Sequence, residues 1–353
     1  MYPRLVLDYK KLVENTEIIV GMCREKGISV MGVGKSVCAW SNAIDAMVEG
    51  GIDYVADARI ENLKKVKHDI PKVLLRLPIK SQISDVVKYS DISLNSSIDT
   101  ISFLNEEAIK QNKVHKIVLM FDIGDLREGI YYKDDYKSKV EEILKFSNTK
   151  IIGIGTNLTC FGAVIPTKET LNKLEKIGKD LESTFNLSFE IKSFGNSSSI
   201  YLLDSNDDFS YFNNLRPGEA IVLGKETAYG AHIKGTHLDV FRFEAQIIEI
   251  YDKPTLPEGE IGVNAFGEKV SYEDRGVVTR AILGFGMQDV NYENLFPKDS
   301  NIEILGASSD HTIIEIKSGN YKIGDVVSFD VEYGSLLMLS TSEYVYKEVE
   351  NGK

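Results

Sequence analysis

The sequence has few of the features that mark disulfide-linked, membrane or metal-binding proteins. Its 353 residues include three cysteines, Cys23, Cys38 and Cys160, and no CxxC pair, which predicts reduced thiols in the cytoplasm. No apolar run is long enough to cross a membrane, and the opening residues lack the basic and apolar regions of a signal peptide. The five histidines form no HExxH or comparable cluster, so we expect no metal site.

Positive charge is also scarce. The 41 lysines and arginines are outnumbered by 53 aspartates and glutamates, which gives a formal net charge of −12. Such a chain has no basic surplus to neutralise phosphates, so its composition argues against a nucleic-acid or anionic-membrane partner. A small cationic substrate is still compatible with it. The hydrophobic content of 43% and the charged content of 27% are typical of an ordinary soluble protein.

Between about residues 29 and 225, short apolar runs alternate with amphipathic helical patterns. Eight such runs predict a parallel sheet closed into a (β/α)8 TIM barrel, with an open doubly wound sheet as the alternative. Several runs are continuously apolar, as expected for strands that are covered on both faces. The runs are 29–35, 52–57, 72–77, 91–95, 115–122, 150–158, 189–196 and 213–224.

The pattern changes after about residue 226. The rest of the chain consists of strand-like segments separated by polar turns, without a long helix, which predicts an all-β domain. We therefore expect a barrel over residues 1–225, whose opening strand could join the second domain instead, and a C-terminal β domain over residues 226–353.

The stretch MGVGKSV, residues 31–37, allows two interpretations. A nucleotide-binding P-loop needs GxxxxGK[ST], but Ser29 stands where the first glycine should be, and residues 28–33 are apolar and β-prone. We favour the other interpretation, in which Lys35 ends the first barrel strand at the face where barrel active sites lie. Neighbouring strands would desolvate its amine, which could then form a Schiff base with a carbonyl substrate or with pyridoxal phosphate.

Clusters of small residues follow the last two predicted barrel strands. The sequence GNSSS occupies residues 195–199, and PGE at residues 217–219 follows Arg216. Barrels build phosphate sites from backbone amides and small hydroxyls at these places. Either cluster alone could be a turn, but their positions relative to Lys35 favour a phosphate-bearing cofactor.

With these motifs, the chain resembles the alanine racemase-like, barrel-type enzymes that use pyridoxal phosphate. The resemblance covers nearly the whole length, and within that group it is greatest to racemases of ornithine. It implies a racemase of a basic amino acid that uses pyridoxal 5'-phosphate, and a homodimer in which the β domain completes the neighbour's active site. The matching segments include FDIGDLREG (121–129), GTNLTCFG (155–162), LRPGEAIVLG (215–224), RAILGFGMQD (280–289) and ILGASSDH (304–311).

The resemblance implies roles for individual residues. Lys35 matches the lysine that holds the cofactor and moves a proton on one face of Cα. Arg127 matches an arginine near the substrate carboxylate, and Asp310 matches an acid that reaches the distal ammonium of a diamino acid. The residues that match the phosphate site are Asn196, Ser197, Gly218, Glu219 and a C-terminal tyrosine, either Tyr344 or Tyr346.

Arg216 matches the residue that faces the pyridine nitrogen of the cofactor. Related decarboxylases have a glutamate there, which keeps the nitrogen protonated and makes the cofactor a strong electron sink. An arginine stays charged at ordinary pH and cannot supply that proton, so brief proton exchange at Cα is favoured over decarboxylation. The alternative is a structural arginine paired with a carboxylate.

The proton-transfer group for the second face of Cα does not follow from the resemblance. Alanine racemases have a tyrosine in a Gly-Tyr-x-Asp motif, whereas residues 286–289 of this chain read GMQD, and methionine cannot transfer a proton. Unless Lys35 or water serves both faces, a further group is needed. The candidates are Asp289, His311, Tyr333 and Cys160, of which we predict Asp289 and His311 to be catalytic.

Two further functions on the same fold are left open by the sequence. The missing tyrosine is compatible with a non-catalytic protein that binds pyridoxal phosphate, although such single-domain carriers lack the additional β domain. A diamino-acid decarboxylase is the other possibility, and Arg216 argues against it.

Overall fold

The computed structural model describes residues 1–263, 266–267 and 269–352, which form two compact units. One unit is Lys10–Leu238, and the other combines Met1–Tyr9 with Asp239–Lys353. The barrel unit thus ends at residue 238 rather than at the predicted residue 225. Residues beyond 225 stay with the barrel because Asn15 hydrogen-bonds with them. Its side chain donates to the carbonyl of His237 at 2.9 Å and accepts from the His237 N–H at 2.6 Å.

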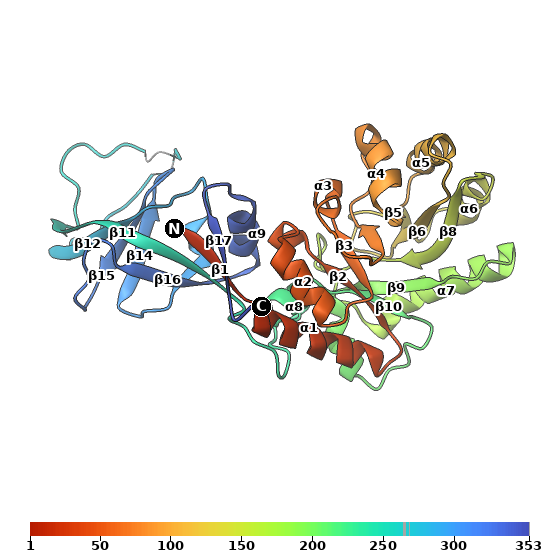
Figure 1. The fold of residues 1–353 in the computed structure, drawn as a ribbon, viewed down its shortest axis with the longest axis horizontal. Coiled ribbons are helices and arrows are strands. Elements are labelled where there is room, and N and C mark those ends of the chain that lie inside the picture. The colour runs from red at the N-terminus through yellow and green to blue at the C-terminus, as the bar shows by residue number, and fades with distance from the viewer. Residues whose placement is uncertain (264–265, 268, 353) are drawn as a thin grey trace. The chain divides into compact units, whose positions relative to one another are not determined.

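The larger unit is a closed barrel of parallel strands (Figure 1). Its strands pair in the order β2-β3-β4-β5-β6-β8-β9-β10, and β10 pairs with β2 to close the ring. The predicted TIM barrel is therefore confirmed, and the open sheet is excluded. The strands are β2 (Ser29–Val33), β3 (Tyr54–Asp57), β4 (Lys72–Leu74), β5 (Ile92–Asn95), β6 (His115–Asp122), β8 (Thr149–Gly155), β9 (Ile191–Asn196) and β10 (Asn214–Arg216), with a short β7 (Ile130–Tyr131) added to the end of β6.

Helices alternate with these strands along the chain. The longest, α7 (Lys168–Phe185), shows why they form: Thr167 caps it by accepting from the N–H of Thr170, and its buried residues recur at helical spacing. The other helices of this unit are α1 (Tyr9–Arg24), η1 (Lys35–Val37), α2 (Ser41–Glu49), α3 (Ile60–Leu63), η2 (Lys80–Gln82), α4 (Ile83–Tyr89), α5 (Ile98–Lys110), α6 (Tyr136–Ile143), η3 (Ser197–Asp204) and α8 (Glu219–Leu223).

Apolar side chains fill the inside of the barrel. They come from successive strands and are buried together, so the barrel is a packed core rather than a pore. Reactive groups must therefore lie at the ends of the strands. The members of this core are Met31, Val33, Ala56, Val73, Ile92, Leu94, Val118, Met120, Ile152 and Ile191.

The smaller unit is built on a mainly antiparallel sheet, which agrees with the predicted β domain except that β1 and β17 pair in parallel and residues 333–341 form a helix. The opening strand β1 (Arg4–Asp8) belongs to it, pairing with β11 and β17. Phe243, Phe285 and Phe329 form its core, with ring centroids 4.8 to 6.1 Å apart. The other elements are β11 (Phe241–Pro254), β12 (Val277–Leu283), η4 (Tyr292–Asn294), β13 (Leu295–Pro297), β14 (Ile302–Ala307), β15 (Thr312–Ile316), β16 (Val326–Val331), α9 (Tyr333–Thr341) and β17 (Tyr346–Glu350).

Candidate active site

Lys35 lies just beyond the carboxyl end of β2, at the first position of η1. The N–H of Gly34 donates to the carbonyl of Ala56 at 2.9 Å, which continues the pairing of β2 with β3 up to the residue before the lysine. A Cβ on Gly34 would come within 2.7 Å of Cδ1 of Ile44, so a larger residue here would displace the end of that α2 side chain. Lys35 therefore stands at the carboxyl-terminal face of the barrel, where barrel enzymes carry their active sites.

The structure excludes the P-loop interpretation of this segment. Residues 29–33, which would have to wrap a phosphate, form β2 and use their backbone groups in the sheet. The prediction that neighbouring strands desolvate Lys35 is wrong for the single chain, in which this side chain is exposed. The reason is its position on the turn beyond the strand, at the rim of the barrel.

Arg216, the last residue of β10, is only 3% exposed. Its guanidinium donates to the carbonyl of Thr156 and to Oδ1 of Asn157, each at 2.6 Å, and to the hydroxyl of Ser193. These acceptors are all uncharged, so the alternative of a structural arginine held by a carboxylate is not met. Burial lowers the pKa of the guanidinium to about 10, which leaves it protonated at neutral pH.

Asn157 connects Arg216 to a second arginine. Its Nδ2 donates to Oε1 of Glu128 at 2.5 Å, and Glu128 is ion-paired with Arg127. Arg127, which we predict to bind the substrate carboxylate, is thus the exposed end of a hydrogen-bonded chain that starts at the buried guanidinium. A substrate carboxylate would share Arg127 with Glu128.

Asn196, Ser197 and Gly218 meet where β9 and β10 end. The hydroxyl of Ser197 accepts from the N–H of Gly218 at 3.0 Å and from the N–H of Ala220 at 3.1 Å. Asn196 caps η3 by accepting from the N–H of Ser198 at 2.8 Å. The structure therefore brings these predicted phosphate-binding residues together, and in this state their polar groups bond to one another.

Other polar groups lie after β2, β9 and β10, which are neighbouring strands of the barrel. The buried hydroxyls of Ser36 and Ser198 have no hydrogen-bond partner among the described residues. Unpaired buried hydroxyls are costly, and they are donors that a phosphate ester can accept from. Glu219, predicted to contribute its backbone amide, begins α8 directly after Gly218. Cys160 is exposed, and its Sγ accepts from Nδ2 of Asn196 at 3.3 Å.

In the β unit, Asp289 is 4% exposed and uses both carboxylate oxygens locally. Oδ1 accepts from the hydroxyl of Ser342 at 2.8 Å, and Oδ2 accepts from the N–H of Gly286 at 3.3 Å. The bond from Gly286 closes the turn at residues 286–289, and the bond from Ser342 ties this turn to the residue that follows α9. They favour a structural role for Asp289 over proton transfer to a substrate.

Asp310 and His311 form a pair on the turn between β14 and β15. Nδ1 of His311 lies 3.0 Å from Oδ1 of Asp310, and the hydroxyls of Ser308 and Ser309 donate to the same oxygen. The hydrogen bonds from His311 and Ser308 lower the pKa of the Asp310 carboxyl below its usual value. In the described part of the chain, Oδ2 of Asp310 and Nε2 of His311 have no hydrogen-bond partner.

The segment that replaces the tyrosine motif lies beside this pair. The N–H of Met287 donates to the carbonyl of Ser308 at 2.9 Å, and that of Gln288 donates to Ser309 at 3.0 Å. Residues 286–289 and 308–311 are thus adjacent. The three tyrosines of the sequence analysis lie on other segments: Tyr333 begins α9, and the exposed Tyr344 and Tyr346 lie before and at the start of β17.

Sequence reasoning missed two residues at the barrel face, Asn157 and Asp57. Asp57 ends β3 and is 1% exposed. Its Oδ1 accepts from the N–H of Arg59 at 2.8 Å and from Nδ2 of Asn62 at 3.1 Å, while Oδ2 has no hydrogen-bond partner in the described chain. Burial raises the pKa of this carboxyl to about 6. The available signal was an acid ending the barrel strand next to that of Lys35.

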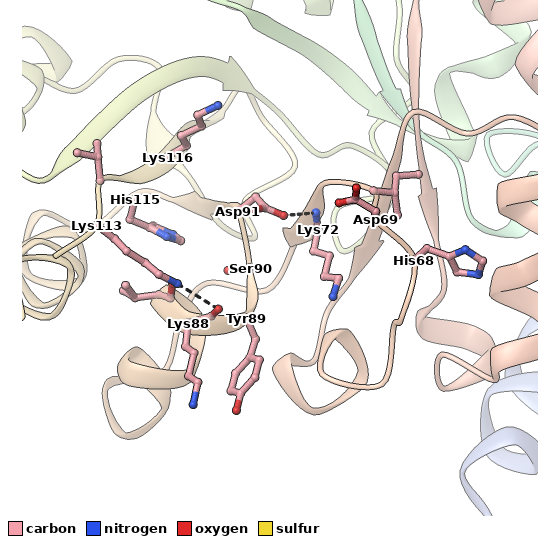
Figure 2. A pocket seen from close by; sticks show the side chains of 13 residues that line it. His68, Asp69, Lys72, Lys88, Tyr89, Ser90, Asp91, Lys113, His115 and Lys116 are labelled. Atoms are coloured by element: carbon pink, nitrogen blue, oxygen red, sulfur yellow. Dashed lines mark hydrogen bonds between the residues drawn. The ribbon is translucent and has the colours of Figure 1, made fainter. Parts of the chain in front are cut away.

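A pocket of about 490 Å³ opens at the opposite end of the barrel (Figure 2). Its lining includes Lys72 and His115, the first residues of β4 and β6, and Asp91, which precedes β5. Since barrel active sites lie at the carboxyl ends of the strands, this pocket is not the candidate site.

The described residues contain neither a cluster of metal-binding side chains nor a membrane-spanning helix. No group of three or more histidines, cysteines, aspartates or glutamates among them could hold a metal ion. Within the same residues, no helix combines the length and the apolar character needed to cross a membrane.

Residues 7–226 match the family model described as alanine racemase, N-terminal domain. An ornithine racemase of Acetoanaerobium sticklandii is 48% identical over 99% of this chain and 100% of that protein. A lysine racemase of Thermotoga maritima is 36% identical over 99% of both.

Solved structures show the same fold at low sequence identity. An alanine racemase from Streptomyces coelicolor gives a TM-score of 0.77 at 14% identity, over 99% of this chain and 98% of that one. An alanine racemase from Bartonella henselae, described with covalently bound pyridoxal phosphate, gives 0.74 at 19% identity over 98% and 99% of the two chains.

Proposed function

The chain belongs to the alanine racemase N-terminal domain family, and from this premise we propose that it is a pyridoxal phosphate-dependent racemase that interconverts L- and D-ornithine. The observation that carries the proposal is the pairing of β2 with β10. Because these strands are neighbours, Lys35, just beyond the end of β2, and the buried Arg216, at the end of β10, lie on the same face of the barrel. Racemisation with this cofactor needs a lysine that holds its aldehyde, which is the role of Lys35. It is also favoured by a cation that cannot protonate the ring nitrogen, which is the role of Arg216.

The residues at this face fit pyridoxal phosphate. The unpaired hydroxyls of Ser36 and Ser198 are suitable donors for its phosphate. Lys35 would hold the aldehyde, and Arg216 would lie against the ring nitrogen. When bound, the cofactor supplies an electron sink that makes the proton on Cα of an amino acid more acidic.

Lys35 would take or return this proton on one face of Cα through its Nζ amine. For the other face we propose His311, because its Nδ1 is oriented by Asp310 while Nε2 has no hydrogen-bond partner among the described residues. The burial of Asp289 and its two local hydrogen bonds make that residue the weaker candidate.

Charge complementarity supports a basic amino acid as the substrate. Arg127 would bind the α-carboxylate, and the unbonded Oδ2 of Asp310 would accept from the distal ammonium. Hydrogen bonds lower the pKa of Asp310, so its carboxyl is ionised at neutral pH. The similarity to an ornithine racemase supports ornithine, and the similarity to a lysine racemase makes lysine the substrate to compare with it.

The test is racemisation of ornithine, lysine and alanine, followed by chiral chromatography, with Lys35→Ala as the control. We expect ornithine to be interconverted fastest and the variant to lose at least about a thousandfold, because one proton-transfer group is gone. No interconversion of ornithine would refute the substrate. No deuterium uptake at Cα of any amino acid would indicate a carrier of the cofactor, and released carbon dioxide would indicate a decarboxylase.

We also propose that the protein is a cytoplasmic homodimer in which the β domain of one copy completes the site of the other. The placement in the cytoplasm rests on the scattered, unpaired cysteines. Mixing inactive Lys35→Ala and His311→Ala proteins tests the dimer. If the site is shared, mixed dimers regain activity at one of their two sites, whereas a site contained in one chain leaves the mixture inactive.

A further inference from the structure

Asp57 and Lys35 lie at the carboxyl ends of two neighbouring barrel strands, Asp57 as the last residue of β3 and Lys35 two residues after β2. Val33 of β2 pairs with Ala56 of β3, and the N–H of Gly34 donates to the Ala56 carbonyl at 2.9 Å. A Cβ atom added to Gly34 would lie 3.6 Å from Oδ2 of Asp57. This carboxylate oxygen is therefore packed against the residue that immediately precedes Lys35.

The two oxygens of Asp57 differ in their surroundings. Oδ1 is held by the N–H of Arg59 and by Nδ2 of Asn62, which fix the carboxylate at the start of α3. Oδ2 is buried and accepts no hydrogen bond in the described chain. Buried polar atoms are nearly always bonded, and one left unbonded costs free energy. The structure thus holds a fixed, unbonded acceptor beside the residue that precedes Lys35.

We propose that Asp57 is a positioning residue for Lys35: when the amine is protonated and not joined to a cofactor, the side chain turns from its place in this structure and donates a charge-assisted hydrogen bond to Oδ2 of Asp57. The four-carbon stem of a lysine lets its amine turn from the barrel mouth towards the adjacent strand end. The role of Lys35 in the reaction rests on the proposed function, but the contact itself does not.

The charged surroundings of Asp57 support this pairing. Burial raises the pKa of the Asp57 carboxyl, and the hydrogen bonds from Arg59 and Asn62, followed by the charge of Lys35 on the turn after β2, act in the opposite direction. Asn62 of α3 in turn accepts from Nζ of Lys65 at 3.2 Å. Leu75, which follows β4, contributes only a backbone N–H, which donates to the Asp57 carbonyl.

The pairing has a consequence for proton transfer. When neutral Lys35 takes the proton from Cα, the proton moves to Nζ and none moves to Asp57. The new ammonium then gains an ionised acceptor and is held near the barrel mouth until the proton is returned.

Competitive acetylation of Lys35 by acetic anhydride tests the pairing. The full-length protein is freed of cofactor with hydroxylamine and labelled between pH 7 and 11, and the peptide containing Lys35 is quantified by mass spectrometry. We expect Asp57→Asn to raise the extent of Lys35 labelling at least about threefold at a given pH, because the amine is no longer held in a hydrogen bond to a carboxylate. Unchanged labelling would overturn the proposal.

Asp53→Asn is the matched control. Asp53 precedes β3 at its other end, where Oδ2 accepts from the N–H of Val30 at 2.7 Å. This variant should leave the labelling of Lys35 unchanged, and an equal rise in both variants would also overturn the proposal. Labelling measures the reactivity of the Lys35 amine directly. The proposed pairing can therefore be confirmed or refuted whether or not the protein racemises ornithine.

The reciprocal variant covers the case in which Asp57→Asn does not fold. An asparagine at position 57 keeps the Oδ1 acceptor for Arg59 and Asn62, although it changes a buried residue. Lys35→Met changes an exposed residue instead, so it disturbs the fold less. In protein labelled with carbon-13 at aspartate side chains, nuclear magnetic resonance follows the titration of the Asp57 carboxyl. We expect its midpoint to rise by at least about half a pH unit when the lysine charge is removed, and equal midpoints would contradict the pairing.

Discussion

Oδ1 of Asn157 accepts a hydrogen bond from Nη2 of Arg216 at 2.6 Å, while Nδ2 of the same amide donates to Glu128. The two neighbours fix the orientation of this amide. Turned over, it would place its NH2 group against the Arg216 donor and its oxygen against the Glu128 acceptor. Asn157 therefore links a buried cation to the acid beside Arg127 without adding a charge of its own.

Replacing Asn157 by alanine should weaken the hold on Arg216 without removing its charge. The guanidinium would keep the Thr156 carbonyl and the Ser193 hydroxyl, but one of its buried N–H groups would lose its acceptor. We expect a loss of about 1–3 kcal/mol of unfolding free energy, measured by urea titration. We also expect about a tenfold lower kcat, since a mobile cation orients the cofactor less well. A variant with the wild-type kcat would show that Asn157 only stabilises the fold.

Replacing Arg216 by glutamate should change the outcome of the reaction as well as its rate. A carboxylic acid can donate a proton to a ring nitrogen, which a guanidinium with a pKa of about 10 does not do at neutral pH. The Cα carbanion would then be more stable and slower to regain its proton. We expect the ratio of side products to racemisation, measured as keto acid and carbon dioxide released from ornithine, to rise at least about tenfold. Arg216→Lys keeps the charge and should not raise this ratio.

The Asp310–His311 pair predicts two separable defects. Asp310→Asn removes the charge that would bind a distal ammonium, so kcat/KM for ornithine should fall about ten- to a hundredfold while that for alanine changes little. His311→Ala removes a proton-transfer group, so kcat should fall for both substrates. Steady-state kinetics with the two amino acids measure both effects. Equal losses for ornithine and alanine in Asp310→Asn would mean that Asp310 acts only through His311.

The sequence predicts the barrel well because its strands are short, buried on both sides and continuously apolar. The run at residues 115–122, for example, coincides with β6. Long-range pairing is harder to foresee: nothing local in β1 indicates that Leu5 pairs with Phe243, far along the chain. The end of the barrel unit was misplaced for the same reason, since the contact between Asn15 and His237 leaves no periodic signal.

The candidate site was predictable only where residue type alone limits the chemistry. A lysine after the first barrel strand and an arginine in the last can be found by reading along the chain. Burial and hydrogen-bond partners cannot be read from the sequence, which therefore does not reveal that both oxygens of Asp289 are bonded, one to Gly286 and one to Ser342. Asp57 was overlooked because an acid at a strand end is common, and only its unpaired oxygen distinguishes it.

Two buried groups of the barrel should give opposite pH dependences of stability. The pKa of Asp57 is raised from 3.8 to about 6 by burial, so the folded chain binds the extra proton and stability falls as pH rises from about 4 to 6. The pKa of His115 is lowered from 6.5 to about 4, also by burial. Here the unfolded chain binds the extra proton, so stability rises with pH through nearly the same range.

Each shift corresponds to about 3 kcal/mol, so in the wild-type protein the two effects largely offset each other. Asp57→Asn should reveal the effect of His115. In this variant the unfolding free energy should rise by about 3 kcal/mol more between pH 4 and pH 7 than it does in the wild type. His115→Gln, which can still accept from the Ser93 hydroxyl, should reveal the opposite slope. Urea titrations of the three proteins at several pH values measure both slopes. Parallel curves would mean that these groups titrate alike in the folded and unfolded chains.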